Sequence, residues 1–156
     1  MSRITNDAED NLYNDLLTVA WHFNSQCSSD LDFEGLTLSD FLTLRLIAEA
    51  PECPVQSIGQ NLGLTKSGAS RVVKRLQTKG LVTSACCPQD GRARRLCLTE
   101  QGTKFVENFT EGQSKWINRL VQSMPSQTAE QVHESLRLFA KFINSEKQRT
   151  AAETSN

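Results

Sequence analysis

The chain has 156 residues, of which 38% are hydrophobic and 22% charged, and its formal net charge at pH 7 is −1. This length suits one sizeable domain with helical extensions, and the composition is that of an ordinary globular protein. No apolar run approaches the roughly 18 residues of a membrane span, and the polar, acidic N-terminus does not resemble a signal peptide. We therefore expect a cytoplasmic protein that has no membrane partner.

The charges are distributed unevenly along the chain. Residues 65–99 contain eight of the seventeen Lys and Arg residues but only one acidic residue, Asp90, so the rest of the chain is strongly acidic. A concentrated basic segment on an otherwise acidic protein is typical of a protein that binds a polyanion, and duplex DNA is the first candidate. The alternative is that these charges form the solvated face of an interaction helix.

The first third of the chain predicts two helices. Apolar side chains at helical spacing predict the first from about residue 10, after a frayed start over residues 1–8. The acidic and polar segment 28–35 is interpreted as a loop. A second helix is predicted over residues 36–50, and residues 53–56 then add a short strand to a small sheet.

Residues 57–79 predict a helix-turn-helix. A short helix ends at Gly63, and Thr65 is a good N-cap for a second helix that runs to Lys79. The first turn of this second helix has no carboxylate, so its free N–H groups can attract phosphate. Its apolar side chains share one face, and the polar and cationic side chains lie opposite them: Ser67, Arg71, Lys74 and Thr78.

Residues 81–99 predict a β-hairpin. Its strands are residues 81–87 and 94–99, joined by a Pro-Gln-Asp-Gly turn. Alternation along the second strand separates two apolar side chains from two others, Leu96 and Leu98 from Arg95 and Cys97.

Two more helices follow the hairpin. Thr99 caps a long helix over about residues 100–123, and a last helix starts at a Ser126 cap. The first helix and these two present more apolar surface than a small winged domain can cover, so we expect them to pack against a second subunit in a symmetric dimer. We therefore divide the chain into dimerisation helices (1–35 and 100–147), a DNA-binding domain (36–99) and a disordered tail (148–156).

In its order of elements the chain resembles the MarR (multiple antibiotic resistance regulator) family of winged-helix transcription factors. The resemblance spans roughly residues 10–147 and is carried by GLTLSDFLTLRLIAEAP, SIGQNLGLTKSGASRVVKRLQTKGLV and PQDGRARRLCLTEQG. It implies a mainly α fold with a small β-hairpin wing, in which a winged helix-turn-helix is joined to a dimerisation bundle of N- and C-terminal helices. It also implies a homodimer that binds a pseudo-palindromic operator in double-stranded DNA.

The resemblance implies that the 65–79 helix enters the major groove and that Arg92 enters the minor groove, oriented by an ion pair with Asp90. Arg92 as a solvent-exposed turn residue is the alternative, and for Arg94 and Arg95 the solubility of an edge strand is an equal alternative. The leading hypothesis is a sequence-specific repressor relieved by a small-molecule effector or by thiol modification. The expected DNA contacts are Thr65, Lys66, Ser67, Ser70, Arg71, Lys74, Arg75, Arg92 and Arg94.

The five cysteines are odd in number and have no C-x₂-C spacing, which argues against a zinc site or a disulfide framework. The simplest interpretation is a set of inert, partly buried thiols. The sharper hypothesis is a thiol switch at Cys86, Cys87 and Cys97, because nearby arginines lower a thiol pKa and one of the adjacent cysteines faces Cys97 across the hairpin. Oxidation there would alter the wing and release DNA.

Other functions have less support in the sequence. His22 and His133 are too few for a zinc site, and we expect no metal and no cofactor. Tyr13, Trp21 and His22 either line an effector pocket or simply pack in the core. The chain has no Gly-rich phosphate loop and no nucleophile elbow, so we do not expect the protein to be an enzyme. The remaining alternative is a winged-helix adaptor that binds proteins without DNA, which the basic segment disfavours.

Overall fold

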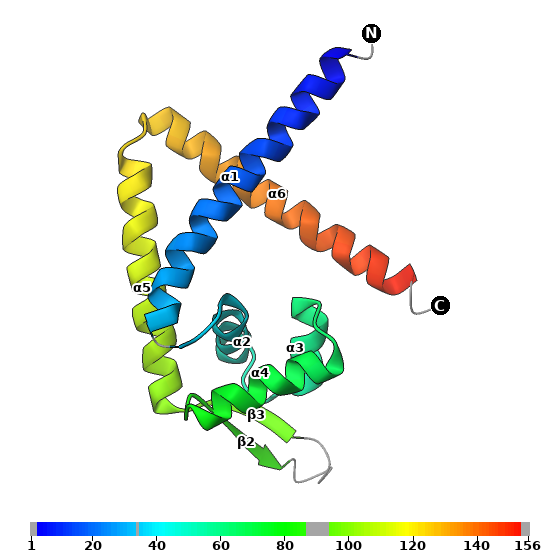
Figure 1. Ribbon diagram of the computed structural model, residues 1–156, viewed down its shortest axis with the longest axis vertical. Coiled ribbons are helices and arrows are strands. Elements are labelled where there is room, and N and C mark those ends of the chain that lie inside the picture. Colours follow the sequence, from blue (N-terminus) through cyan, green and yellow to red (C-terminus); the bar gives the residue numbers. More distant parts are fainter. Residues whose placement is uncertain (1–2, 34, 87–93, 154–156) are drawn as a thin grey trace. The chain divides into compact units, whose positions relative to one another are not determined.

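The computed structural model describes residues 3–33, 35–86 and 94–153 (Figure 1). It is mainly helical, with one antiparallel sheet of three strands in the order β1-β3-β2, which confirms the predicted fold class. The chain divides into two compact units, Met1–Thr110 and Glu111–Asn156. Within the described ranges, no helix combines the length and the apolar character that crossing a membrane requires.

Helix α1 (Arg3–Phe33) is longer than the sequence predicts. It covers most of the expected frayed start, and the prediction of a loop is wrong for residues 28–33. Cys27 and Leu31 lie one turn apart and are buried in the core of the first unit, with Leu31 fully inaccessible to solvent. This burial keeps the acidic segment helical, because tertiary packing outweighs weak local preferences.

Helix α2 (Leu38–Glu49) begins with a capping box. The Thr37 hydroxyl accepts a hydrogen bond from the Asp40 N–H (3.3 Å), and the Asp40 carboxylate accepts one from the Thr37 N–H (2.8 Å). The chain then forms the two-residue strand β1 (Cys53–Pro54), which pairs with β3. The predicted short strand is therefore present, but it ends where the next helix begins.

Helices α3 (Val55–Leu62) and α4 (Lys66–Thr78) form the predicted helix-turn-helix. Gly63 ends α3 in the left-handed region (φ 65°, ψ 28°), and the Thr65 hydroxyl accepts a hydrogen bond from the Gly68 N–H at 3.1 Å. These two local signals account for the sharp turn between the helices. The predicted apolar face of α4 is buried, as Ala69, Val72, Val73 and Leu76.

Strands β2 (Val82–Cys86) and β3 (Arg94–Leu98) form the predicted hairpin. Leu96 is 1% exposed, whereas Cys97 on the other face is only half-buried. The expectation that Cys86 or Cys87 faces Cys97 is wrong for Cys86, since Thr83 lies opposite Cys97 and Cys86 lies opposite Arg94. This register is set by the core, because it places the buried Val82 opposite the half-buried Leu98. Cys87 lies outside the described residues.

Helix α5 (Glu100–Gln122) begins in the first unit, with its N-terminal end packed in the core. The Thr99 hydroxyl accepts a hydrogen bond from the Gly102 N–H at 3.0 Å, as expected for the predicted cap. Gly102 has no space for a side chain, because a Cβ there would meet the Leu81 carbonyl oxygen. Val106 and Phe109 then complete the core that carries the helix-turn-helix.

Helix α6 (Ser126–Glu153) belongs to the second unit. It continues through Glu153, into the segment that the sequence predicts to be disordered. An ion pair one turn apart, between Arg149 and Glu146 (3.2 Å), lies in this last part of the helix. Residues 146–153 also contain no glycine or proline that would end the helix earlier.

Candidate nucleic-acid interface

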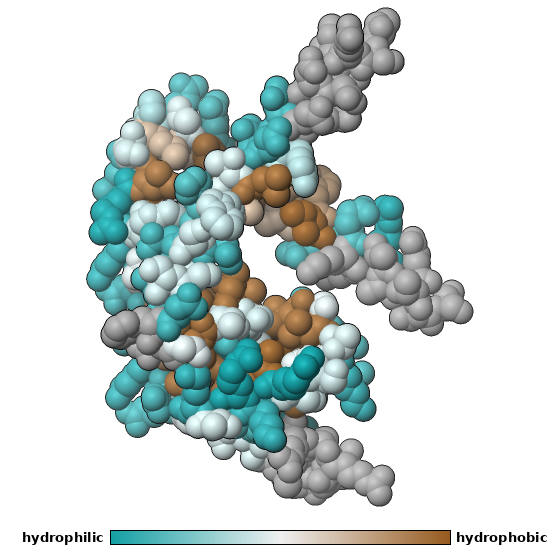
Figure 2. All heavy atoms as spheres, in the orientation of Figure 1, coloured by the Kyte–Doolittle hydropathy of each residue, from teal (hydrophilic) through white to brown (hydrophobic). Residues whose placement is uncertain are grey.

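The face of α4 that points away from the core is polar and cationic. Every predicted contact residue on this helix and at its N-cap is exposed, and Figure 2 shows a hydrophilic surface over α4. No acidic side chain lies in its first turn. A helix with its apolar face buried and its N-terminus free of carboxylates can approach a polyanion closely. The exposed residues are Thr65, Lys66, Ser67, Ser70, Arg71, Lys74 and Arg75.

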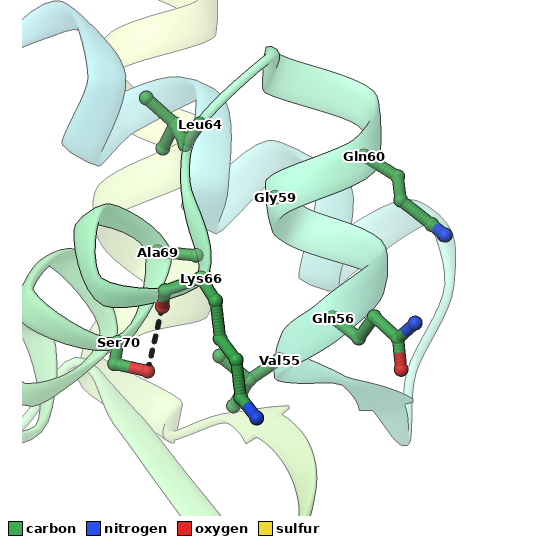
Figure 3. A pocket seen from close by; sticks show the side chains of 8 residues that line it. All are labelled: Val55, Gln56, Gly59, Gln60, Leu64, Lys66, Ala69 and Ser70. Atoms are coloured by element: carbon green, nitrogen blue, oxygen red, sulfur yellow. Dashed lines mark hydrogen bonds between the residues drawn. The ribbon is translucent and has the colours of Figure 1, made fainter. Parts of the chain in front are cut away.

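The flank of α4 that faces α3 contains a pocket of about 400 Å³ (Figure 3). Lys66 and Ser70 form part of its rim, and the Ser70 hydroxyl donates a hydrogen bond to the Lys66 carbonyl at 2.9 Å. Gln56 and Gln60 lie one turn apart on α3 and are exposed beside it. Sequence reasoning missed these two amides, although their spacing on the helix before the turn was visible.

The opposite flank of α4 packs against α2 through an ion pair. Arg75 donates from Nη2 to Asp40 Oδ1 at 2.6 Å, and from Nε to both carboxylate oxygens at 3.0 and 3.1 Å. Asp40 is 0% exposed, whereas the Arg75 side chain is 43% exposed. The local sequence does not predict this ion pair, because it joins residues that are 35 positions apart.

Polar side-chain contacts connect both strands of the wing to other parts of the first unit. Gln77 Nε2 on α4 donates to the Ser84 hydroxyl on β2 at 3.1 Å. Arg95 on β3 forms an ion pair with Glu52 at 3.0 Å, and both side chains remain partly exposed. Arg94 is the first residue of β3. Asp90 and Arg92, the predicted wing pair, lie outside the described residues.

The described thiols differ in their surroundings. Burial raises the pKa of the Cys27 thiol, and the nearby Asp30 raises it further. Burial also raises the pKa of the Cys53 thiol, against a smaller lowering by a backbone hydrogen bond. Both residues are therefore poor thiolates. Cys97 is half-buried on β3, on the face opposite Leu96, and none of these three cysteines is in a disulfide.

No metal-binding group is found among the described residues, since no cluster of three or more His, Cys, Asp or Glu side chains forms. Tyr13 and Trp21 are 63% and 68% exposed on α1. They are therefore not part of the core of a single chain. His22 beside them is also exposed.

The fold and this cationic helix define a winged helix-turn-helix protein. Residues 34–93 match the sequence model of the MarR family. The HTH-type transcriptional regulator MhqR of Bacillus subtilis (strain 168) is 23% identical over 114 residues, which cover 73% of this chain and 79% of MhqR.

Solved structures of MarR proteins share the fold. A MarR family protein from Bacillus stearothermophilus superimposes with a TM-score of 0.80 at 18% identity, covering 89% of this chain and 97% of that one. FabT of Streptococcus pneumoniae, in complex with DNA, superimposes with a TM-score of 0.69 at 16% identity, covering 93% and 99%. The chain is therefore similar to MarR family proteins, in sequence over residues 34–93 and in fold over most of its length.

Proposed function

We propose that this protein is a homodimeric regulator that binds a pseudo-palindromic operator in double-stranded DNA, with α4 in the major groove. The observation that carries the proposal is the division of α4 into a buried apolar face and an exposed cationic face without acids in its first turn. Two structures with the same fold are described as bound to nucleic acid, FabT with DNA and a Staphylococcus aureus MepR mutant with an oligodeoxyribonucleotide.

The side chains of α4 divide by position into base and phosphate contacts. Ser67, Arg71 and Lys74 lie at the centre of the exposed face, where a helix in the major groove meets base edges. Thr65 and Lys66 at its start and Ser70 and Arg75 on its flanks are placed for phosphates. We assign Arg92 to the minor groove with Asp90 as its ion-pair partner, and Arg94 to the backbone beside it.

A dimer accounts for the apolar surface that one chain leaves exposed. Large hydrophobic side chains are exposed along α1, and also on α5 and α6 of the second unit. In that unit a broad groove of about 820 Å³ lies between α5 and α6, lined by Ile117, Val121, Val132 and Leu136 among others. Exposed apolar surface of this kind marks an interaction site, and a second copy of the same helices is its natural complement.

We further propose that the protein is a repressor, relieved by a small-molecule effector or by thiol modification in the wing. Cys97 lies on β3, between Leu96 and Leu98 in the strand that forms the wing. Oxidation of Cys86, Cys87 or Cys97 adds polar atoms within or beside the hairpin. A change in the hairpin then alters the minor-groove contact.

The proposal is tested by selecting bound sequences from random duplexes with the full chain. We expect enrichment of a sequence with two inverted half-sites separated by about one helical turn. The logarithm of the binding constant should fall with the logarithm of salt concentration by about 0.9 for each phosphate contacted. No enrichment, together with no binding to random duplex at low salt, would contradict the proposal.

A further inference from the structure

Asp40 is the only fully buried charged side chain among the residues whose burial is described. Its Oδ2 accepts hydrogen bonds from the Thr37 N–H and from the Thr37 hydroxyl, both at 2.8 Å. Its Oδ1 accepts the shortest hydrogen bond from Arg75, at 2.6 Å. The carboxylate is thus held by the start of its own helix on one side and by the recognition helix on the other.

Arg75 presents only one edge of its guanidinium to Asp40. Nε and Nη2 donate to the carboxylate, so the edge that carries Nη1 points away from it. The side chain remains 43% exposed. A planar group clamped at two nitrogens and open at the third has a fixed direction in which it can bind a further anion.

We propose that Asp40 is a positioning residue that orients Arg75 to bind a DNA phosphate at the α2 flank of α4. The inference rests on the proposed function, since it requires α4 to lie in the major groove. The walls of that groove are the two phosphate backbones, so the flanks of an inserted helix face phosphates while its centre faces bases. Arg75 lies on the flank where α4 meets α2, and Lys66 lies on the flank where it meets α3.

Two opposing effects decide how Asp40 affects binding. Its negative charge weakens the attraction of Arg75 for phosphate, and this effect alone would make removal of the charge favourable for DNA binding. The ion pair also fixes a long, flexible side chain before DNA arrives, so that binding loses less conformational freedom. We infer that the orienting effect is larger. The carboxylate is fully buried at one edge of the guanidinium, whereas a phosphate would approach the other, exposed edge, farther from the negative charge.

The test is Asp40→Asn, measured as affinity for the selected operator and as its salt dependence. An Asn oxygen in the place of Oδ2 keeps both contacts of Thr37 and the longer Nε contact of Arg75 (3.1 Å). Its amide nitrogen in the place of Oδ1 faces Arg75 Nη2, so the shortest contact and the charge attraction that orient the guanidinium are lost. We expect binding to weaken at least fivefold, although the net charge of the variant is one unit more positive. The slope of log affinity against log salt should decrease by about 0.9, the value of one lost phosphate contact.

Glu49→Gln is the matched control, because it makes the same change of charge at an exposed ion pair on the same helix, with Arg45 at 3.0 Å. We expect its operator affinity to stay within twofold of the wild type. Arg75→Lys is the second variant, should Asp40→Asn fold poorly. It keeps the charge but not the planar fork, so it should show the same weaker binding and the same smaller salt slope.

The outcomes separate this inference from the proposed function. Equal or tighter operator binding by the folded Asp40→Asn or Arg75→Lys variant would overturn the positioning role alone. A lower unfolding temperature with an unchanged salt slope would also overturn it, because that pattern marks a purely structural ion pair. If the wild-type chain binds no duplex at all, the proposed function fails first.

Discussion

Apolar side chains are buried around the helix-turn-helix of this chain but exposed on its long helices. In the first unit, Leu44, Ile58 and Leu76 are completely or almost completely buried within one chain. On α6 of the second unit, Leu136 and Phe142 are 53% and 68% exposed. The apolar side chains of the first region are buried within a single chain. Those of the second are as apolar as a core but remain exposed to solvent. We therefore expect the exposed apolar face of α6, and not the core around the helix-turn-helix, to bind a second copy of the chain.

The largest effect is expected from a charge on the exposed apolar face of α6. Leu136→Asp should raise the dissociation constant of the dimer at least 100-fold. Burial of a leucine contributes about 1.5–3 kcal/mol, and burial of an unpaired carboxylate costs more. Sedimentation equilibrium measures this change directly.

Asn144→Asp is the control for that substitution, since Asn144 is exposed on α6 but lies off its apolar stripe. It should leave the dimer intact. A Leu136→Asp protein that remains as dimeric as the wild type would show that this face of α6 does not form the interface.

Two glycines on α5, one in each unit, should respond to alanine in opposite ways. Gly102→Ala should lower the free energy of unfolding by about 1–3 kcal/mol, because the new Cβ meets the Leu81 carbonyl in a packed core. Gly112→Ala should raise it by about 0.5–1 kcal/mol, because a Cβ there meets nothing within 4 Å and alanine favours the helix. Urea unfolding followed by circular dichroism measures both. Similar changes in the two variants would mean that Gly102 is not closely packed.

Arg71→Ala tests the exposed face of α4. It should weaken operator binding by about 1–3 kcal/mol if Arg71 pairs with a guanine, and the loss should disappear on an operator changed at that base. Titration of labelled duplexes by fluorescence anisotropy gives both values. Arg45→Ala, on the exposed surface of α2, is the matched loss of one arginine and should change affinity little. Equal losses on every duplex would make Arg71 a phosphate contact.

The smallest effect is expected at the start of α4. Thr65→Ala removes the hydroxyl that accepts the Gly68 N–H and should cost about 1 kcal/mol of stability. Thr65→Ser keeps that oxygen and should cost much less. Thermal unfolding of the two variants checks the difference, and equal melting temperatures would show that the cap contributes nothing.

The parts of the fold that the sequence predicted well are those set by local signals. Gly63 and Thr65 mark the turn of the helix-turn-helix, and the spacing of Ala69, Val72 and Leu76 identifies the buried face of α4. Alternation likewise separated Leu96 from Cys97 on β3. Each of these features depends on a few neighbouring residues, so it can be recognised without knowledge of the tertiary structure.

The features that the sequence did not predict depend on distant contacts. Helix α1 continues through an acidic segment because Leu31 is buried in a core made mostly by later residues. The second role of Asp40 requires Arg75, and the register that separates Cys86 from Cys97 follows from the pairing of the two strands. The roles of Asp90 and Arg92 stay predictions, since both lie outside the described residues.

The proposed function requires two copies of α4 to read two half-sites on one face of the DNA. Its most direct test is the affinity of the wild-type chain for the selected operator after insertion of five base pairs between the half-sites. Half a helical turn, about five base pairs, places the second half-site on the opposite face of the duplex. We predict that binding falls to the level of random duplex. An unchanged affinity would contradict the claim.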